Sequence, residues 1–247
     1  RNHTSTAKLA KILKPAVSGL LMEKEIRCLS QALDNPERPF TAVVGGAKVS
    51  SKIGVLENLL DKVDNMIIGG GMAYTFVKAN GGKIGNSICE DDQIETAKAI
   101  EKKAAEKGVK LVMATDVLVT DDFSGNGTNK FVKINEIPDG FEGVDAGPDS
   151  RKAFADVLKS SKTILMNGPV GAFENPKFAE GTKAVLEAIV EATKAGATSV
   201  IGGGDSVSAA KKFFKAEDFT HVSTGGGASL EFIEGKVLPG VAALDDK

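Results

Sequence analysis

Two lysines and one aspartate follow glycine-rich segments of the chain, and these residue types suit chemistry on phosphate groups. Lys48 and Lys52 come after Gly45-Gly46-Ala47, and Asp205 comes directly after Gly202-Gly203-Gly204. Ammonium groups bind phosphate oxygens, and a carboxylate can bind the Mg²⁺ that accompanies a polyphosphate. The lysines are predicted on one face of a helix in its first turns, where they oppose the dipole, so phosphate contact is favoured over a solvated face. For Asp205, a helix N-cap is an equally good interpretation.

Four glycine-rich segments follow predicted strands and precede predicted helices: Gly45-Gly46-Ala47, Gly69-Gly70-Gly71, Gly202-Gly203-Gly204 and Gly225-Gly226-Gly227. In an open parallel sheet all such loops lie at the carboxyl edge, where ligands bind. Glycine lets the backbone approach a ligand, and helix N-termini offer free N–H groups to phosphate. Any one segment is equally consistent with a tight turn, whereas four together favour one polyphosphate-binding crevice. Neither the pattern G-x-x-x-x-G-K-[ST] nor a complete dinucleotide fingerprint occurs, which argues against those folds.

A further polar segment runs from Asn167 to Glu174, directly after another predicted strand. Asn167 offers a neutral hydrogen-bond donor, and the Glu174 carboxylate can accept a hydrogen bond from a ribose hydroxyl. The proline and glycines of this segment are equally consistent with an ordinary turn, and Glu174 with an acid at a helix start. In the Gly202 segment, Ser206 can donate a hydrogen bond to a phosphate oxygen.

The elements that would position these residues alternate between strand and helix. From residue 40 onward, short β-branched runs alternate with longer helical patterns, which is typical of βαβ units. Strands are predicted at Phe40 to Val44, Asn65 to Ile68, Lys110 to Met113, Phe131 to Ile134, Thr163 to Met166, Thr198 to Ile201 and His221 to Ser223. The sequence therefore predicts an α/β fold of three αβα layers, with a Rossmann-like, doubly wound, mostly parallel sheet of about six strands. Between Asp121 and Pro148 the chain is polar and glycine-rich, so a surface excursion with little beyond one strand is expected.

Three helices have clear patterns of their own. Apolar residues recur at helical spacing between Val185 and Ala192, and Gly196 follows as a C-terminal signal. Between Met22 and Leu33 an apolar stripe predicts a long connecting helix ahead of the first sheet strand. Acidic residues at 90–92 precede lysines at 102–107, an order that complements a helix dipole.

The composition excludes several classes of function. With 31 basic and 33 acidic residues the net charge is −2, so no overall field attracts nucleic acid or an anionic membrane. Cys28 and Cys89 lie far apart and only two histidines occur, which argues against a zinc cluster and favours a reduced, intracellular protein. No run approaches about 18 apolar residues and no secretion signal is evident. A cytoplasmic location is therefore expected, with neither nucleic acid nor membrane as a partner.

Several segments resemble the C-terminal half of phosphoglycerate kinases. They are Val43 to Lys52, Gly69 to Phe76, Asn167 to Glu174, Gly202 to Ser206, and Ser223 to Glu231. The resemblance runs from about residue 15 to the end of the chain. It implies reversible transfer of the acyl phosphate of 1,3-bisphosphoglycerate to ADP, which gives 3-phosphoglycerate and ATP in glycolysis, with Mg²⁺ accompanying the ADP or ATP.

The resemblance also implies roles for individual residues. Lys52 and Lys48 would contact the nucleotide and transferring phosphates, the backbone at Gly204 and Gly227 would meet the migrating phosphoryl group, and Asp205 would be the metal ligand. The implied nucleotide-binding set is Gly46, Ala47, Lys48, Lys52, Gly70, Gly143, Asn167, Gly168, Val170, Phe173, Glu174, Gly203, Gly204, Asp205, Ser206, Gly225 and Gly226.

The same resemblance divides the chain into three parts. Residues 1–14 correspond to a remnant of the family's N-terminal domain, 15–35 to its interdomain helix and 36–247 to its nucleotide-binding domain. In the family that N-terminal domain binds 3-phosphoglycerate through a basic patch, of which Arg1 would be one member. Since the chain starts without methionine, a truncated or processed product is expected, with little or no activity alone. The intact enzyme is expected to be a monomer.

Two positions depart from the family pattern. Met166 stands where tryptophan is usual, and Ala172 where a larger aliphatic residue is common, and both are interpreted as packing changes. Two other functions remain open: a non-catalytic nucleotide-binding or interaction module on the same scaffold, and an NAD-dependent dehydrogenase. Retention of four residues favours the kinase over the module: Lys48, Lys52, Asp205 and Glu174. The missing dinucleotide fingerprint argues against the dehydrogenase.

Overall fold

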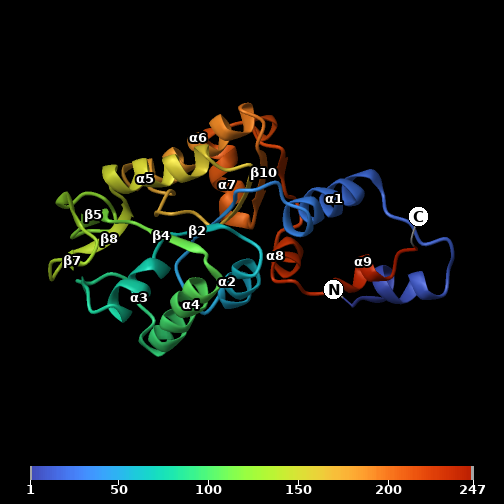
Figure 1. Ribbon diagram of the computed structural model, residues 1–247, viewed down its shortest axis with the longest axis horizontal. Helices are drawn as coiled ribbons and strands as arrows, with labels where there is room; N and C mark the ends of the chain where they lie inside the picture. The colour runs from blue at the N-terminus through green and yellow to red at the C-terminus, as the bar shows by residue number, and fades with distance from the viewer. Residues whose placement is uncertain (1, 246–247) are drawn as a thin grey trace.

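A central sheet of six parallel strands organises the chain, whose computed structural model describes residues 2–245 (Figure 1). The strands are β1 (Phe40–Val44), β2 (Asn65–Ile68), β4 (Lys110–Met113), β9 (Thr163–Asn167), β10 (Thr198–Gly202) and β11 (His221–Val222). Their order is β11-β10-β9-β1-β2-β4, and every neighbouring pair is parallel. The chain winds outward from β1 to β4 and then returns to β9 on the other side of β1. The predicted doubly wound αβα fold is therefore confirmed, with its topological switch point between β1 and β9.

Helices cover both faces of this sheet because successive strand side chains point to opposite sides. The helices are α1 (Leu20–Asp34), α2 (Ile53–Leu60), α3 (Met72–Ala79), α4 (Ile94–Lys107), α5 (Pro148–Lys159), α6 (Glu180–Lys194), α7 (Gly204–Phe213), α8 (Gly227–Ile233) and α9 (Pro239–Ala242). In β1, Ala42 and Val44 pack into the core beneath α2, α3 and α4, whereas Val43 packs into the core beneath α5, α6 and α7 (Figure 1). Short helical turns occupy Thr4–Lys8, Leu9–Lys11, Asp91–Gln93, Pro176–Phe178 and Ala216–Asp218.

The three helices with clear sequence patterns are present as predicted. The apolar stripe after Met22 belongs to α1, and the repeating pattern around Val185 belongs to α6. At the end of α4, Gly108 adopts the left-handed conformation with φ 71°, and its backbone N–H is bonded to carbonyls of the last turn. Gly196, after α6, also has a positive φ, of 100°. A helix often ends at a residue with positive φ, and glycine suits this position because residues with a side chain rarely adopt such backbone angles.

The segment between β4 and α5 forms additional sheets, which the sequence analysis missed. Strands β5 (Asp116–Thr120), β6 (Asn129–Lys133) and β8 (Glu142–Ala146) make an antiparallel sheet in the order β6-β5-β8, and β3 (Lys83–Ile84) pairs with β7 (Glu136–Ile137). The run at Phe131 is therefore a strand of this second sheet and not of the central one. The prediction of little beyond one strand between Asp121 and Pro148 was wrong, because β6, β7 and β8 all lie in that segment. β6 and β8 pair with β5, which itself packs against Tyr74 and Val77 of the distant α3, and no local pattern reveals these contacts.

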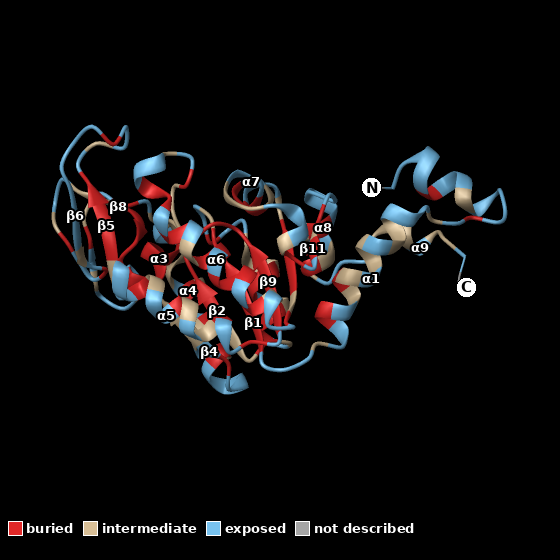
Figure 2. Cartoon of the chain, turned by 90° about the horizontal axis from the view of Figure 1, so that it is seen from above, coloured by how far each residue is buried: buried red, intermediate tan, exposed pale blue. Residues whose placement is uncertain are grey.

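The helical turn at Thr4–Lys8 and the C-terminal helix α9 contact each other next to α1 and extend from the sheet domain (Figure 1, Figure 2). Lys14 forms an ion pair with Asp245, and the Asp245 backbone N–H donates to the Ala16 carbonyl at 2.8 Å. Large apolar side chains here remain exposed, with Ile12 at 77% and Leu20 at 85%. Arg1 lies outside the described residues. Among residues 2–245, no helix has both the length and the apolar character needed to cross a membrane.

Glu25 on α1 connects this helix to the segment after β11. Its carboxylate accepts hydrogen bonds from the Ser223 hydroxyl at 2.8 Å and from the Thr224 backbone N–H at 2.6 Å, and its Oε2 lies 2.9 Å from Nε2 of His221. Burial by itself would raise the pKa of Glu25, but His221 and these donors outweigh it and lower the pKa to about 2. The contact therefore stabilises the folded chain only while Glu25 is ionised.

We expect this contact to make the chain sensitive to acid. The pKa of Glu25 lies at about 2 in the folded chain against an ordinary 4.5, so its contribution is complete above pH 4.5 and is lost as the pH falls toward 2. Glu25→Gln should lower the free energy of unfolding by about 2 kcal/mol at pH 7, less than the full pKa shift implies because solvent screens part of the interaction. The difference from wild type should shrink below pH 4.5.

Urea unfolding at several pH values measures the acid sensitivity of the Glu25 contact. Glu57→Gln, on the exposed face of α2, is the control, because it removes a carboxylate without removing this contact. A difference between Glu25→Gln and wild type that does not change with pH would contradict the assignment.

Candidate functional site

Three loops interlock where β1, β2 and β9 end. The Gly45 backbone N–H donates to the Asn167 carbonyl at 3.1 Å, and the Gly70 N–H donates to the Val170 carbonyl at 3.2 Å. A Cβ on Gly45 would lie 2.0 Å from the Pro169 carbonyl oxygen, and one on Gly168, whose φ is +110°, would lie 2.0 Å from the Gly45 carbonyl oxygen. Only glycine permits this close backbone crossing. Of the four glycine-rich segments predicted to share one crevice, those at residues 45–47 and 69–71 meet here, together with the loop after β9. The prediction was wrong for the segment at residues 225–227, because Gly225 lines a different groove beside α1 and α8.

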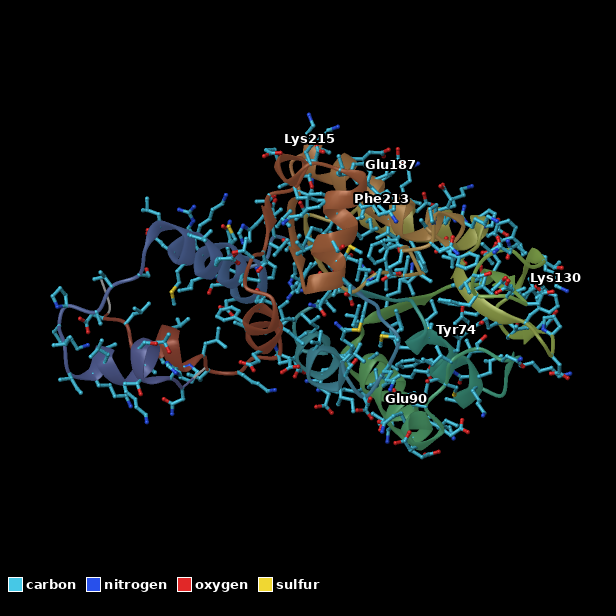
Figure 3. All side chains as sticks on the ribbon, turned by 180° about the vertical axis from the view of Figure 1, so that it is seen from behind. Tyr74, Glu90, Lys130, Glu187, Phe213 and Lys215 are labelled. Carbon is cyan, nitrogen blue, oxygen red and sulfur yellow. The ribbon has the colours of Figure 1, made fainter. Side chains whose placement is uncertain are left out.

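A cavity of about 320 Å³ opens beside this crossing, and we call it the switch-point cavity. Seven residues predicted to bind nucleotide line it: Gly46, Ala47, Gly70, Gly143, Val170, Glu174 and Asp205. The remaining lining residues were not predicted as site residues: Gly71, Tyr74, Ile88, Phe123, Glu142, Val144, Pro169, Gly171 and Ala172. Tyr74 comes from α3 (Figure 3), and Phe123 comes from the connection between β5 and β6. An aromatic residue in a polar, glycine-rich segment was the only sequence signal for Phe123.

Lys52, in the loop before α2, lies beside the switch-point cavity without lining it, and its Cε is 3.7 Å from a Cβ projected at Gly46. Its Nζ donates a hydrogen bond to Oδ1 of Asn167, which is fully buried. Burial lowers the pKa of Lys52, while the carboxylates of Asp205 and Glu234 oppose that shift. The ammonium group can exchange its hydrogen bond to the amide oxygen for one to a phosphate oxygen, and the lysine side chain does not need to move far.

The predicted helical setting of the two lysines was wrong. Helix α2 begins at Ile53, with Lys52 as its N-cap, so Lys48 and Lys52 lie in the loop and not on one helical face. Residues 45–52 form the loop that connects the end of β1 to the start of α2. In this loop the Lys52 backbone N–H donates to the Val49 carbonyl at 2.8 Å, which makes a turn and not a helix. Lys48 is exposed.

Asp205 and Ser206 lie in the first turn of α7 and have different environments. The N-cap of α7 is Gly203, with φ +87°, so the alternative interpretation of Asp205 as N-cap was wrong. Asp205 is exposed on the cavity wall, and its side chain makes no hydrogen bond or ion pair within residues 2–245. Ser206 is fully buried, and its Oγ accepts a hydrogen bond from the Gly168 N–H at 2.5 Å. Asp205 is thus available to a ligand, whereas Ser206 holds a neighbouring loop.

Several predicted residues do not line the cavity. Phe173 is buried in the core shared with α5, α6 and α7. Gly203 lies close to the Asn167 side chain, at 3.0 Å between its projected Cβ and Nδ2. Gly225 lines a different space, an apolar groove of about 930 Å³ between α1, α8 and the chain ends. The predicted roles of these residues, and those of Gly204, Gly226 and Gly227, stay predictions.

The carboxylates of the cavity would repel an anionic ligand such as a phosphate, so a cation bound between them and the ligand would be favourable. Three carboxylates line it, from Glu142, Glu174 and Asp205. Burial raises the pKa of a fourth, Asp145, to about 7, and this side chain lies behind the cavity wall at Gly171. Within residues 2–245 no group of three or more acidic, histidine or cysteine side chains is arranged to hold a metal alone. One exposed carboxylate with phosphate oxygens from a ligand is the donor set that suits Mg²⁺.

The sequence matches the phosphoglycerate kinase family over residues 1–236. This chain belongs to that family. Two solved structures of phosphoglycerate kinases are similar to it. The enzyme from Coxiella burnetii has a TM-score of 0.94 and 44% identity, over 98% of this chain and 62% of that one. The enzyme from Pyrococcus horikoshii has a TM-score of 0.83 and 30% identity, over 99% of this chain and 60% of that one. The chain therefore spans about three fifths of the length of these phosphoglycerate kinases.

The two departures from the usual phosphoglycerate kinase pattern lie in packed positions. Met166 is fully buried in β9, in register with Val43 of β1 and Ile201 of β10. Ala172 packs against the small core of Leu118, Val144 and Phe178 at the second sheet. Met166 does not line the cavity, whereas Ala172 does. This arrangement agrees with the interpretation that Met166 changes packing and not chemistry.

Proposed function

We propose that this chain is the nucleotide-binding part of a phosphoglycerate kinase and that it binds Mg-ADP or Mg-ATP in the switch-point cavity. The observation that carries the proposal is the meeting of glycine-rich loops, Glu174 and Asp205 around one cavity, with Lys52 beside it. The carboxyl edge at a topological switch point is where open α/β sheets bind ligands. Family membership supplies the reaction class, which is phosphoryl transfer by a kinase.

The reaction we propose is reversible transfer of the acyl phosphate of 1,3-bisphosphoglycerate to ADP. Phosphoryl transfer needs little covalent chemistry and much positioning and charge stabilisation. Lys52 would bind the nucleotide and transferring phosphates with help from Lys48 and Asn167, and Glu174 would accept hydrogen bonds from the ribose. The backbone N–H groups at Gly204 and Gly227 would meet the migrating phosphoryl group.

Asp205 is the residue that would hold Mg²⁺, together with phosphate oxygens of the nucleotide. The bound ion would neutralise negative charge that the three cavity carboxylates would otherwise repel. It would not require a second protein ligand, since Mg²⁺ commonly keeps several waters.

We also propose that 3-phosphoglycerate binds to a part of the enzyme beyond this chain. The solved phosphoglycerate kinases are longer than the region that this chain covers. The division of the chain into a remnant of the N-terminal domain (1–14), an interdomain helix (15–35) and a nucleotide-binding domain (36–247) stays a prediction. The chain alone would then bind nucleotide and turn over little or no substrate. A nucleotide-binding module without catalytic function, built on the same scaffold, is the second candidate.

Calorimetric titration of the folded chain with ADP, with and without Mg²⁺, tests the proposal. We expect micromolar to sub-millimolar binding that Mg²⁺ strengthens, and no comparable binding of NAD⁺. A coupled kinase assay on the same sample should show little or no turnover, and turnover should appear when the chain is joined to the remainder of a phosphoglycerate kinase. Binding without turnover in the joined protein would support the non-catalytic module, and a folded sample that binds no ADP would rule out the cavity as a nucleotide site.

A further inference from the structure

Helix α7 forms hydrogen bonds to both ends of the loop formed by residues 168–174. At the start of the helix, Ser206 Oγ accepts the hydrogen bond from the Gly168 N–H at 2.5 Å. Near its end, Lys212 Nζ donates to the carbonyl of Phe173 at 2.8 Å and to that of Glu174 at 3.1 Å. Ser206 and Lys212 are separated by about 9 Å along a helix axis. The loop therefore spans the helix between two fixed points.

Lys212 is held in place by more than these two carbonyls. Its ammonium lies 5.7 Å from the ring centroid of Phe173 and 5.5 Å from that of Phe213. Phe213, labelled in Figure 3, is the last residue of α7. Both rings can attract a cation through their π faces. The neighbouring Lys211 lies in the same last turn, is exposed, and makes no hydrogen bond or ion pair within the part of the chain that is described. Both lysines complement the helix dipole, so the bonds to the loop carbonyls and the two ring contacts distinguish Lys212.

The held loop forms one wall of the switch-point cavity. Pro169 through Ala172 and Glu174 line the cavity from this loop, and Asp205 lines it from the first turn of α7. Directly after Glu174, the side chain of Asn175 donates to the Ser124 carbonyl at 3.2 Å, and Lys177 Nζ donates to the Gly125 carbonyl at 2.7 Å. The backbone of Glu174 is thus fixed to α7 on one side, and the segment that follows it is fixed to the β5–β6 connection.

We propose that Lys212 is a positioning residue that fixes Glu174 relative to Asp205 and thereby sets the affinity of the cavity for the sugar of the nucleotide. This inference rests on the proposed function, in which Glu174 binds the ribose and Asp205 the metal. Lys212 itself lies outside the cavity lining, so it acts through the backbone of Glu174. Loss of its two charge-assisted bonds frees that backbone and weakens the ribose contact while the phosphate contacts of Lys52 remain.

The test compares Lys212→Met with Lys211→Met, and measures binding of Mg-ADP, Mg-2′,3′-dideoxy-ADP and Mg-pyrophosphate by calorimetry. We expect Lys212→Met to weaken ADP binding about tenfold, to weaken dideoxy-ADP binding much less, and to leave pyrophosphate binding unchanged. Lys211→Met should match wild type with all three ligands. Lys212→Arg, which can still donate to both carbonyls, should restore most of the ADP affinity.

The outcomes separate this inference from the proposed function. If wild type binds no ADP, the proposed function fails. If wild type binds ADP and Lys212→Met binds it equally well, or loses equal affinity for all three ligands, the positioning role is wrong and the nucleotide site stands. Thermal unfolding of each variant shows whether it is folded. If Lys212→Met is unfolded, Lys212→Gln takes its place, because its polar side chain tolerates solvent while its shorter, uncharged amide loses both charge-assisted bonds, and the same ligand comparison decides.

Discussion

Replacing Asp205 with asparagine is expected to remove the part of ADP affinity that depends on Mg²⁺. The amide would keep the size of the side chain but not its charge, so the cavity would lose the exposed carboxylate on α7 that we propose as the Mg²⁺ ligand. We expect Mg-ADP to bind about tenfold to a hundredfold more weakly, to a level near that of ADP without metal. Titration with ADP at several Mg²⁺ concentrations measures this. The thermal stability should hardly change, because Asp205 makes no hydrogen bond or ion pair within residues 2–245.

Asp149→Asn is the matched control for this substitution. Asp149 also lies exposed in the first turn of a helix, α5, and therefore has a similar interaction with a helix dipole. It does not line the cavity. Both variants should lose the same small dipole contribution to stability, and only Asp205→Asn should lose Mg²⁺-dependent affinity. If the two variants bind Mg-ADP equally well, Asp205 is not the metal ligand.

Substitution of Gly168 with alanine should destabilise the fold by about 4 kcal/mol and abolish nucleotide binding. Its φ of +110° is unfavourable for alanine, and the added Cβ would lie 2.0 Å from the Gly45 carbonyl oxygen. Both the Cβ and this oxygen are fixed by the backbone, so no side-chain rotation can relieve the contact. The loops of β1 and β9 would have to separate, which moves both walls of the crevice. Urea unfolding and ADP titration measure the two effects.

Gly196→Ala separates the backbone angle from the close contact. Gly196 has a similar φ, of +100°, but a Cβ there would meet nothing within 4 Å. Alanine at this position should cost about 1 to 2 kcal/mol and leave ADP binding intact. The amount by which Gly168→Ala lowers the free energy of unfolding beyond Gly196→Ala then measures the cost of the steric clash where the two loops cross. Equal losses in the two variants would mean that the crossing loops can move apart freely.

The positions of the central strands were accessible to sequence analysis because both of their faces are buried. In β1 all five residues are buried, and the strand is correspondingly a continuous run of β-favouring residues. The strands of the second sheet follow a weaker pattern. β6 is largely exposed and charged, so its pairing with β5 depends on partners elsewhere in the chain. Local patterns predict the first kind of strand well and the second kind poorly.

The candidate site divides in the same way. Gly46 and Gly70 could be placed at the sheet edge because strand-to-helix loops of a parallel sheet all lie there. Gly143 and Val170 were indicated only by family resemblance. Gly143 enters the cavity wall because the second sheet packs against α3, where a Cβ at this position would lie 2.0 Å from the Tyr74 hydroxyl. Phe123 reaches the same wall from a connection that no periodicity describes.

The sequence by itself determined the mostly parallel sheet, the alternation of strands and helices along the chain, and the placement of the Gly45 and Gly69 segments at one sheet edge. Hydrophobic periodicity and glycine backbone freedom act over short distances along the chain, so a local pattern is enough to show them. Only the tertiary structure decided which of those loops share a cavity. It placed Lys52 in a loop against Asn167, gave the N-cap of α7 to Gly203, and left Asp205 exposed. These outcomes depend on contacts between residues far apart in the chain, and such contacts arise only when the layers pack together.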